Sequence, residues 1–266
     1  MRFRDRCATK GLTATLDGFP EAINMLSNAH GMVIVCGPIG AGKTTTASGL
    51  VRHLCEEHKR HIMCLEDPVE YFLEPGEGSC THIETNLTSA DDVTGASLRE
   101  IMPKVFRSDI DGLFLGEVRT AEAMDTCFSF SSTHEPVVTT MQGGSIGDTV
   151  VRAMNLASEK KGWEMAKLTL TSCLHAIIHV DLAFDDKGGA VPVVLCMPAK
   201  STTIRQIISS ATPASLLNQI NAALNDGRPE EGFIGPKASQ QQACKRGAEL
   251  DSVRALFKKN DVAEAA

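Results

Sequence analysis

The sequence has few aromatic residues, no excess of positive charge and no long apolar run. Its 266 residues include one Trp and one Tyr, and its formal net charge is -7. Nucleic-acid binding usually needs a basic surface and aromatic side chains that stack on bases, so we expect no direct binding of nucleic acid. No apolar run reaches the length of a transmembrane segment, and residues 1–10 lack an apolar signal region. We therefore expect any membrane association to depend on partners.

The cysteines also lack a recognisable framework. Nine are scattered along the chain, and none belongs to a C-x-x-C pair. A disulfide scaffold or a zinc site would need paired cysteines at closer spacing. Several lie within apolar runs, where a free cysteine behaves as a small hydrophobic residue. This pattern favours reduced thiols in a cytoplasmic protein.

The most informative stretch is a glycine-rich turn that follows the apolar run 32–36. Residues 37–44 fit the G-x-x-x-x-G-K-[ST] spacing of a phosphate-binding loop. Glycines let the backbone wrap closely around a phosphate, and the helix that follows adds the positive end of its dipole. Lys43 would neutralise the β- and γ-phosphates, and the Thr44 hydroxyl would hold Mg²⁺. The predicted nucleotide-binding residues of this loop are Gly37, Gly40, Ala41, Gly42, Lys43, Thr44 and Thr45.

Apolar runs that alternate with helical patterns indicate the fold class. Residues 137–141 and 191–197 are typical of strands, whereas 121–130 and the stretch around 150–158 are typical of helices. Residues 168–180 are apolar and fit either a helix or a strand. Alternation of this kind around a phosphate-binding loop predicts an α/β fold with a largely parallel sheet flanked by helices.

The chain divides into three expected parts. Residues 1–30 form a leader with one short helix beginning at Pro20, residues 31–210 form the nucleotide-binding domain, and residues 211–266 form a short helical tail. In the tail, we expect a helix over 216–224, a linker over 225–237 and a last helix over 245–258. Three smaller predictions concern a turn-rich loop at 74–78, a helix capped at 89–92 that runs towards Phe106, and a hairpin turn at 185–189.

Two of the apolar runs end in carboxylates. Glu66 and Asp67 follow the run 62–65, with Glu70 nearby, and Glu117 ends the run 111–117. Hydrolysis of a nucleotide needs a metal ion, a group that orients water, and positive charge on the phosphoryl oxygens. An acid at a strand end is often only a solvated edge residue, but two of them downstream of a phosphate-binding loop favour a catalytic site. The predicted catalytic residues are Glu66, Glu117 and Lys43, and the predicted metal-binding residues are Thr44 and Glu117.

At this point the sequence resembles a known family. GPIGAGKTTT at 37–46, LEDPVEYF at 65–72, FRSDIDGLFLGEVRTAEA at 106–123 and STHEPVVTTMQ at 132–142 resemble, in order and spacing, four signature segments of the secretion-type ATPases. These ATPases drive type II and type IV secretion and the assembly and retraction of type IV pili. The resemblance covers about residues 18–208 and implies a RecA-like domain that binds ATP and Mg²⁺ within a homohexameric ring.

The resemblance also implies roles for individual residues. Glu66 would polarise the attacking water, and Glu117 would act on Mg²⁺ through a water molecule. Arg119 and Gln142 stand at family positions close to the nucleotide, and we expect both to contribute to its binding. Arg107 and His134 also match family positions. The alternative for Arg107, as for Arg119, is an ion pair that holds the acidic edge, and for His134 a structural hydrogen bond is an equally good explanation.

Three departures from the family pattern affect the expected activity. Gln142 replaces a histidine; it can hydrogen-bond a phosphate or a water molecule but cannot carry positive charge. Thr120 replaces an acid and removes a salt-bridge partner. Family members have an N-terminal domain that supplies arginines to a neighbouring subunit, whereas about thirty residues precede the loop here. Arg2, Arg4 and Arg6 could replace those arginines only in part, because a chain terminus is poorly suited to preorganised charge. We therefore expect a fragment, a partner-dependent enzyme or a weak ATPase.

The sequence therefore predicts an Mg²⁺-dependent, ATP-hydrolysing motor subunit of a type IV secretion, conjugation or type IV pilus machine. It would lie in the cytoplasm and contact inner-membrane components of that machine. The alternative is a nucleotide-binding structural or regulatory subunit with little hydrolysis, which Gln142 and Thr120 favour. A nucleotide or small-molecule kinase ranks last, because nothing resembles an arginine-bearing lid. Protein, DNA and pilin all remain possible cargoes, and either direction of pilus movement remains open.

Overall fold

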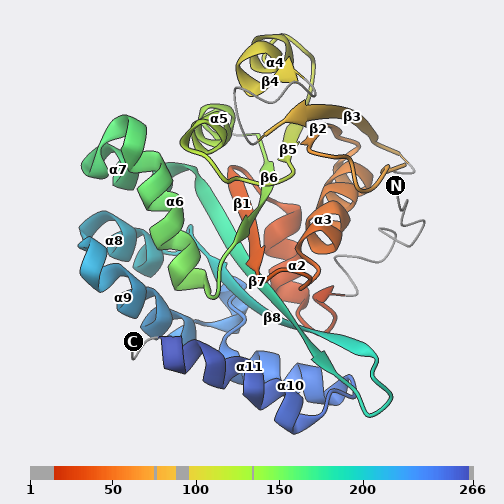
Figure 1. Cartoon of the computed structure of the whole chain (residues 1–266), viewed down its shortest axis with the longest axis vertical. Helices are drawn as coiled ribbons and strands as arrows, with labels where there is room; N and C mark the ends of the chain where they lie inside the picture. Colours follow the sequence, from red (N-terminus) through yellow and green to blue (C-terminus); the bar gives the residue numbers. More distant parts are fainter. Residues whose placement is uncertain (1–14, 75–76, 88–95, 134, 264–266) are drawn as a thin grey trace.

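The computed structural model describes residues 15–74, 77–87, 96–133 and 135–263. In this part of the chain, one sheet contains the strands β1 (Met32–Gly37), β2 (His61–Glu66), β3 (Ser79–Asn86), β4 (Ala96–Ser97), β5 (Gly112–Leu115), β6 (Val137–Gln142), β7 (Leu174–Phe184) and β8 (Ala190–Pro198). Their order across the sheet is β4-β3-β2-β5-β6-β1-β7-β8 (Figure 1). Each neighbouring pair is parallel except β7 with β8, which is antiparallel. The prediction of a largely parallel sheet flanked by helices is confirmed.

The helices lie between the strands along the chain, and the last of them follow β8. They are α2 (Pro20–Ser27), α3 (Lys43–His58), α4 (Leu98–Val105), α5 (Ala121–Ser131), α6 (Ile146–Lys161), α7 (Trp163–Cys173), α8 (Thr202–Ser210), α9 (Pro213–Asp226), α10 (Pro236–Lys245) and α11 (Leu250–Ala263), with a short 3-10 turn η2 (Pro229–Glu231). Among the described residues, no helix combines the length and apolarity needed to cross a membrane.

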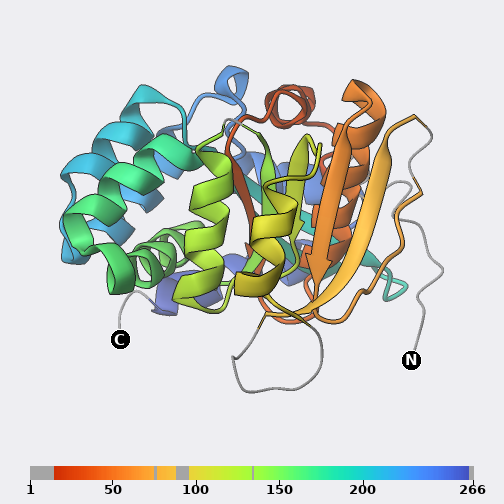
Figure 2. The same ribbon diagram turned by 90° about the horizontal axis from the view of Figure 1, so that it is seen from above.

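The central strand β1 explains why both faces of the sheet are covered. All its residues are buried, and its side chains alternate between two cores. Val33 and Val35 pack with α2 and α3 on one face, whereas Met32 and Ile34 pack on the face covered by α5, α6 and α8. Figure 2 shows α6 to α9, in green to light blue, grouped together at one side of the molecule.

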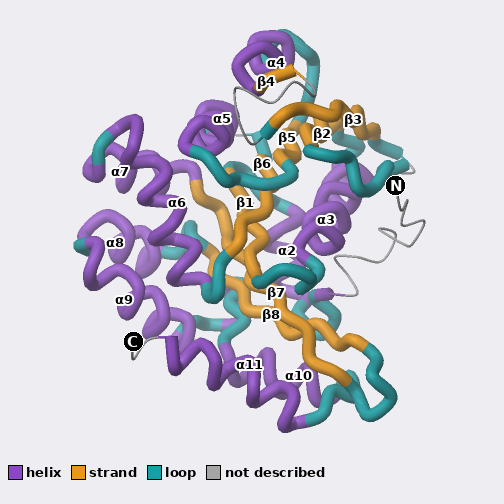
Figure 3. The backbone as a smooth tube through the Cα atoms, in the orientation of Figure 1, coloured by secondary structure: helices purple, strands orange, loops and turns teal. Residues whose placement is uncertain are grey.

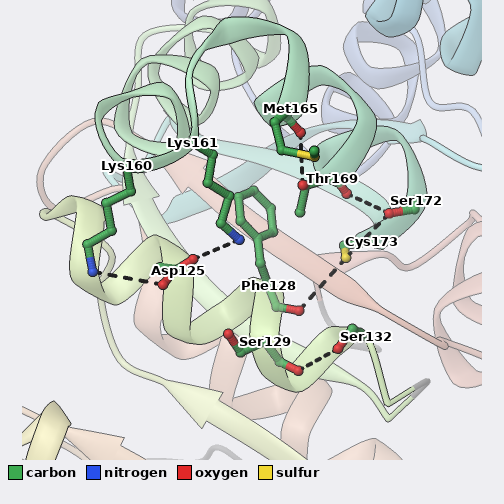
Figure 4. A network of polar contacts seen from close by, with 10 residues as sticks. All are labelled: Asp125, Phe128, Ser129, Ser132, Lys160, Lys161, Met165, Thr169, Ser172 and Cys173. Carbon is green, nitrogen blue, oxygen red and sulfur yellow. Dashed lines mark hydrogen bonds and ion pairs between the residues drawn. The ribbon is translucent and has the colours of Figure 1, made fainter.

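Polar contacts join the helices of that second face. Lys161 near the end of α6 lies 2.8 Å from Asp125 of α5, and its ammonium group is 5.5 Å from the ring centroid of Phe128 (Figure 4). Lys160 lies 3.8 Å from the same carboxylate. On α7, Cys173 points its sulfur at the carbonyl of Phe128. These contacts stabilise the packing of α5, α6 and α7.

The outer half of the β7–β8 hairpin has its own small core. Ala183 and Val191 of the hairpin pack against Ala243 of α10 and Val253 of α11. Figure 3 shows the two purple helices running along the orange hairpin. The turn that joins the strands lies at 185–189, as expected, and is closed by the N–H of Asp185 donating to the carbonyl of Gly189.

Several local predictions needed correction. The ambiguous stretch 168–180 divides into the end of α7 at Cys173 and the start of β7 at Leu174. The last helix, expected over 245–258, begins later, at Leu250, because α10 ends at Lys245 and Gly247 follows in a left-handed conformation with φ of 95°. The expected linker contains η2, and its Ile234 pairs with Cys196 of β8.

The region around α4 and β3 also differs from the sequence-based expectation. The expected cap at 89–92 lies outside the described residues, and α4 is capped instead by Ser97 and Glu100, whose carboxylate accepts from the Ser97 N–H at 3.0 Å. Strand β3 was not predicted. It follows directly after the turn that ends at Gly78.

Candidate active site

The phosphate-binding loop connects the end of β1 to the start of α3. Gly40 and Gly42 have φ of 81° and 89°, a left-handed conformation that favours glycine. Gly37 has φ of 151°, and a Cβ atom there would lie 2.2 Å from the backbone oxygen of Val180. The local backbone therefore explains why these three positions are glycines, and Ala41 between them is buried.

Lys43 and the two threonines after it open α3. The Lys43 Nζ atom donates to the carbonyl of Pro38 at 2.8 Å, so the side chain folds back over the loop. Partial burial lowers the pKa of Lys43, while the charge of Glu117 opposes that shift. Thr44 lines a pocket described below, and the Thr45 hydroxyl lies 3.1 Å from the hydroxyl of Tyr71. Nucleotide binding by these side chains stays a prediction.

One pocket at the carboxyl edge of the sheet brings the loop and the acids together. Glu66 is the last residue of β2 and is 3 % exposed, whereas Glu117 lies two residues beyond β5. Because parallel strands end at the same edge, acids that are distant in sequence become neighbours here. The residues that line the pocket are Thr44, Glu66, Asp67, Pro68, Glu70, Leu87, Gly116, Glu117, Arg119 and Thr140.

Glu66 is held by a histidine of the neighbouring strand. The Nδ1 atom of His82 on β3 lies 3.0 Å from Glu66 Oε1, and both side chains are almost fully buried. The Nε2 atom of the same ring accepts the N–H of Leu73 at 3.1 Å. Since Nε2 is an acceptor, the ring is neutral with its proton on Nδ1, and it donates that proton to the carboxylate. His82 therefore fixes the direction in which Glu66 points.

Glu117 is paired with the arginine two residues further along. Arg119 Nη2 donates to Glu117 Oε2 at 2.5 Å, and this hydrogen bond raises the pKa of Arg119. The arginine side chain is half-exposed at the mouth of the pocket. Arg107 is exposed after α4 and does not line this pocket.

The segment that carries Glu117 is attached firmly to the sheet. The Thr140 hydroxyl donates to the carbonyl of Gly116 at 2.7 Å, and the N–H of Val118 donates to the carbonyl of Thr140 at 2.9 Å. On the other side, the N–H of Gly116 donates to the carbonyl of Leu65 at 2.8 Å. The acid is thus positioned by backbone contacts with both adjacent strands.

Gln142 lies where the family resemblance places a histidine. It is the last residue of β6 and stands opposite Gly37 in the register of β1 and β6. It is therefore next to the start of the phosphate-binding loop, and its contact with nucleotide stays a prediction. His134, Arg2, Arg4 and Arg6 lie outside the described residues.

The donor set of the pocket fits a hard divalent cation. The Thr44 hydroxyl and the carboxylates of Glu117, Glu66 and Asp67 all border it, and Glu70 adds another. Oxygen ligands of this kind are those that Mg²⁺ prefers. The residues predicted for Mg²⁺ from the sequence, Thr44 and Glu117, therefore line the same pocket.

Sequence reasoning missed His82. It belongs to β3, where alternate residues Cys80, His82 and Glu84 share one face, but the stretch was left without an assigned structure. The signal that could have indicated a strand was this period-two arrangement of side chains immediately after a turn. Parallel pairing then places His82 opposite Cys64, beside Glu66.

Comparison with known proteins identifies the family of this chain. Residues 8–188 match the family described as type II/IV secretion system protein. The chain belongs to this family. It is 26 % identical over 234 residues to a twitching motility protein of Neisseria gonorrhoeae, covering 80 % of this chain and 58 % of that protein. It is 28 % identical over 203 residues to the type IV pilus retractation ATPase PilT of Pseudomonas aeruginosa, covering 74 % and 57 %.

Solved structures with low sequence identity share the fold of this chain. The ATPase DotB of Legionella pneumophila matches with a TM-score of 0.75 and 16 % identity, over 92 % of this chain and 64 % of that one. The pilus retraction motor PilT, solved with bound ADP, matches with a TM-score of 0.72 and 22 % identity, over 89 % and 64 %. These likenesses confirm the RecA-like fold. The chain spans less than two thirds of each of these four relatives.

Proposed function

We propose that this chain is the ATP-binding and ATP-hydrolysing motor subunit of a type IV secretion, conjugation or type IV pilus machine. The observation that carries the proposal is the shared pocket, in which Thr44 of the phosphate-binding loop faces Glu66, Glu117 and Arg119. Membership of the type II/IV secretion family adds to it. Acids at strand ends beside a phosphate-binding loop supply the groups that nucleotide hydrolysis requires.

Each side chain has a distinct role in this proposal. The loop N–H groups and Lys43 bind the phosphates, and Glu66, oriented by His82, accepts a hydrogen bond from the attacking water. Thr44 and Glu117 would hold Mg²⁺, which supplies positive charge to the phosphate oxygens when bound. Arg119 exchanges its bond to Glu117 for the developing charge on the γ-phosphate.

The decisive experiment compares two glutamine variants. Glu66→Gln should abolish phosphate release in the presence of ATP and Mg²⁺ while fluorescent ATP-analogue binding persists. Glu84→Gln is the matched control, because Glu84 stands opposite Glu66 in the β2–β3 register but is exposed. Unchanged turnover in Glu66→Gln would refute the assignment of this carboxylate, and Lys43→Ala should remove both binding and turnover.

We further propose that the motor is a homohexamer in the cytoplasm, attached to inner-membrane components of its machine. The support is the family match and the structural likeness to PilT and DotB. Mass measurement in solution, with and without a non-hydrolysable ATP analogue, tests the ring. A nucleotide-dependent hexamer is expected, and a monomer at all nucleotide concentrations would contradict it.

A second candidate is a nucleotide-binding structural or regulatory subunit with little hydrolysis. It is favoured by the engagement of both candidate acids with protein partners, Glu66 with His82 and Glu117 with Arg119, and by Gln142. It predicts tight ATP binding with negligible turnover. Mg²⁺-dependent turnover that disappears in Lys43→Ala would exclude it.

A further inference from the structure

Three thiols converge beneath the phosphate-binding helix. The sulfur of one of them, Cys64, lies within 4.8 Å of ligand atoms of both Glu66 and His82. Cys55 comes from α3, Cys64 from β2 and Cys80 from β3. The Sγ atoms of Cys55 and Cys80 lie 3.4 Å apart. The parallel register pairs Ile62 with Cys80 and Cys64 with His82, so these side chains leave the sheet on the face that α3 covers.

Close packing at a glycine brings Cys55 and Cys80 together. A Cβ atom at Gly78 would lie 2.8 Å from the Cβ atom of Cys55 and 2.6 Å from its carbonyl oxygen. Only glycine therefore allows α3 to approach the start of β3 this closely. A disulfide needs a sulfur–sulfur distance of about 2.05 Å, so the two sulfurs have to approach each other by roughly 1.4 Å.

The thiols of Cys80 and Cys55 differ in pKa and in exposure to solvent. Cys80 is partly exposed, whereas Cys55 and Cys64 are buried. Hydrogen bonds from the Cys55 and Cys64 thiols, with smaller contributions from His82 and His61, lower the pKa of Cys80 to about 4. The same hydrogen bond and burial raise the pKa of Cys55. Cys80 is thus the most acidic of the three thiols, with the Cys55 thiol in contact, the arrangement found at oxidation-sensitive cysteines.

We propose that Cys80 and Cys55 form a disulfide when the protein meets a hydroperoxide. The Cys80 thiolate attacks the terminal peroxide oxygen, the O–O bond breaks, and the released alkoxide takes up a proton to leave as an alcohol, or as water from hydrogen peroxide. Cys80 is then a sulfenic acid. Cys55 loses its proton and attacks the Cys80 sulfur; the S–S bond forms and hydroxide leaves, combining with that proton as water. Two thiols lose two electrons in total, and the hydroperoxide gains them.

The bond would connect two parts of the candidate active site. Helix α3 carries Lys43 and Thr44 at its start, and β3 carries His82. A covalent link between Cys55 and Cys80 ties the phosphate-binding helix to the strand that orients Glu66. The modification is independent of the proposed ATPase activity, because its chemistry needs only the two cysteines and the hydroperoxide.

Peptide mapping of the whole chain tests the proposal. The protein is treated with hydrogen peroxide, alkylated with iodoacetamide, and digested with trypsin and a glutamate-specific protease, which separates Cys64 from Cys80. We expect a peptide pair joined through Cys55 and Cys80 that dithiothreitol separates. The pair should persist in Cys64→Ser and in Cys244→Ser, a control at a second partly exposed cysteine. In Cys55→Ser it should disappear, and dimedone should trap the sulfenic acid on Cys80.

Measurements on the unaltered chain keep the test independent of any variant that fails to fold. At pH 6, iodoacetamide should alkylate Cys80 about 10-fold faster than Cys244, because only the thiolate reacts. Equal rates at the two cysteines would overturn the assignment of Cys80 as the reactive thiolate. A peroxide-induced link from Cys64 to either other cysteine, or the absence of any link to Cys80, would overturn the pairing.

Discussion

Glu66 and His82 form a buried hydrogen bond of 3.0 Å between adjacent strands. The main-chain N–H of Leu73 fixes the other side of the ring at 3.1 Å and leaves it a single proton to donate. A carboxylate held in this way presents its second oxygen in a defined direction. That second oxygen is the group that our proposed mechanism assigns to the attacking water.

We predict that His82 contributes to turnover rather than to nucleotide affinity. His82→Ala should lower kcat by about 10- to 100-fold, because small displacements of a catalytic group are costly. KM for ATP should change little. His82→Asn should recover part of the loss, since its amide N–H₂ can replace Nδ1 as the donor. Steady-state kinetics measure kcat and KM for each variant, and His61→Gln, at the start of β2, is the control. A larger change in KM than in kcat would argue against a positioning role.

A second prediction concerns the Arg119 side chain. Because its ion pair with Glu117 is half-exposed, Arg119→Ala should change the free energy of unfolding by less than about 1 kcal/mol. Turnover should fall by about 10²–10³-fold if the guanidinium stabilises the transition state. Arg99→Ala removes another exposed arginine, paired with Glu122 at 3.8 Å, and serves as the control. Full activity in Arg119→Ala would leave the residue a structural role only.

A third prediction compares two glycines of the phosphate-binding loop. Gly37→Ala should destabilise the protein by about 1–3 kcal/mol, because the added Cβ would lie 2.2 Å from the carbonyl oxygen of Val180. Gly40→Ala meets no atom within 4 Å and should cost only the left-handed conformation, about 1 kcal/mol. Chemical denaturation measures both. Equal losses of unfolding free energy in the two variants would show that the left-handed backbone conformation alone, and not the contact with Val180, determines the destabilisation.

A fourth prediction concerns pH. Burial lowers the pKa of His179, and the same holds for His175 and His53, so the unfolded chain binds protons more readily than the folded protein. With respect to these histidines, the free energy of unfolding is therefore at its full value above pH 6.5. It decreases as the pH falls below 6.5, by up to about 1.4 kcal/mol per pH unit for each histidine. Denaturation curves between pH 7.5 and pH 5 should show this slope.

Substitution separates the contribution of one histidine. His179→Gln should flatten the pH dependence below pH 6.5, because the buried group no longer titrates in the unfolded state. His58→Gln, at an exposed position on α3, controls for the change of residue type. An unaltered slope in His179→Gln would show that other groups carry the pH dependence.

The parts of the site that depend on local patterns were predictable from the sequence. The loop at 37–44 has a spacing that only a few backbone conformations satisfy. Glu66 and Glu117 each end an apolar run, and the parallel arrangement of the strands brings such ends to one edge. Their partners were harder to foresee. The period-two pattern of β3 could have placed His82 on the same face as Glu66. The hydrogen bond between them, and that between Arg119 and Glu117, depend on side-chain directions that periodicity does not encode.

The helix and the strand that the sequence analysis did not predict, α10 and β3, lack a strong hydrophobic pattern. Helix α10 has the sequence PKASQQQACK and packs through the small residues Ser239 and Ala243. The Ser239 hydroxyl accepts the N–H of Val194 at 3.0 Å, so part of its attachment to β8 is polar. Strand β3 similarly carries Cys80 and His82 on the face under α3, where longer apolar side chains would have marked it as a strand. Tertiary contacts, rather than local sequence, determine both.

The contacts of Gly116 and Val118 also bear on local opening. Their amides donate to the carbonyls of Leu65 and Thr140, which belong to the two strands on either side of β5. Breaking either bond requires separating central strands of the sheet, so these amides should exchange hydrogen only through global unfolding. The acidic wall of the pocket then belongs to the most protected part of the molecule, and faster exchange is expected for amides in the exposed tip of the loop, such as Gly40.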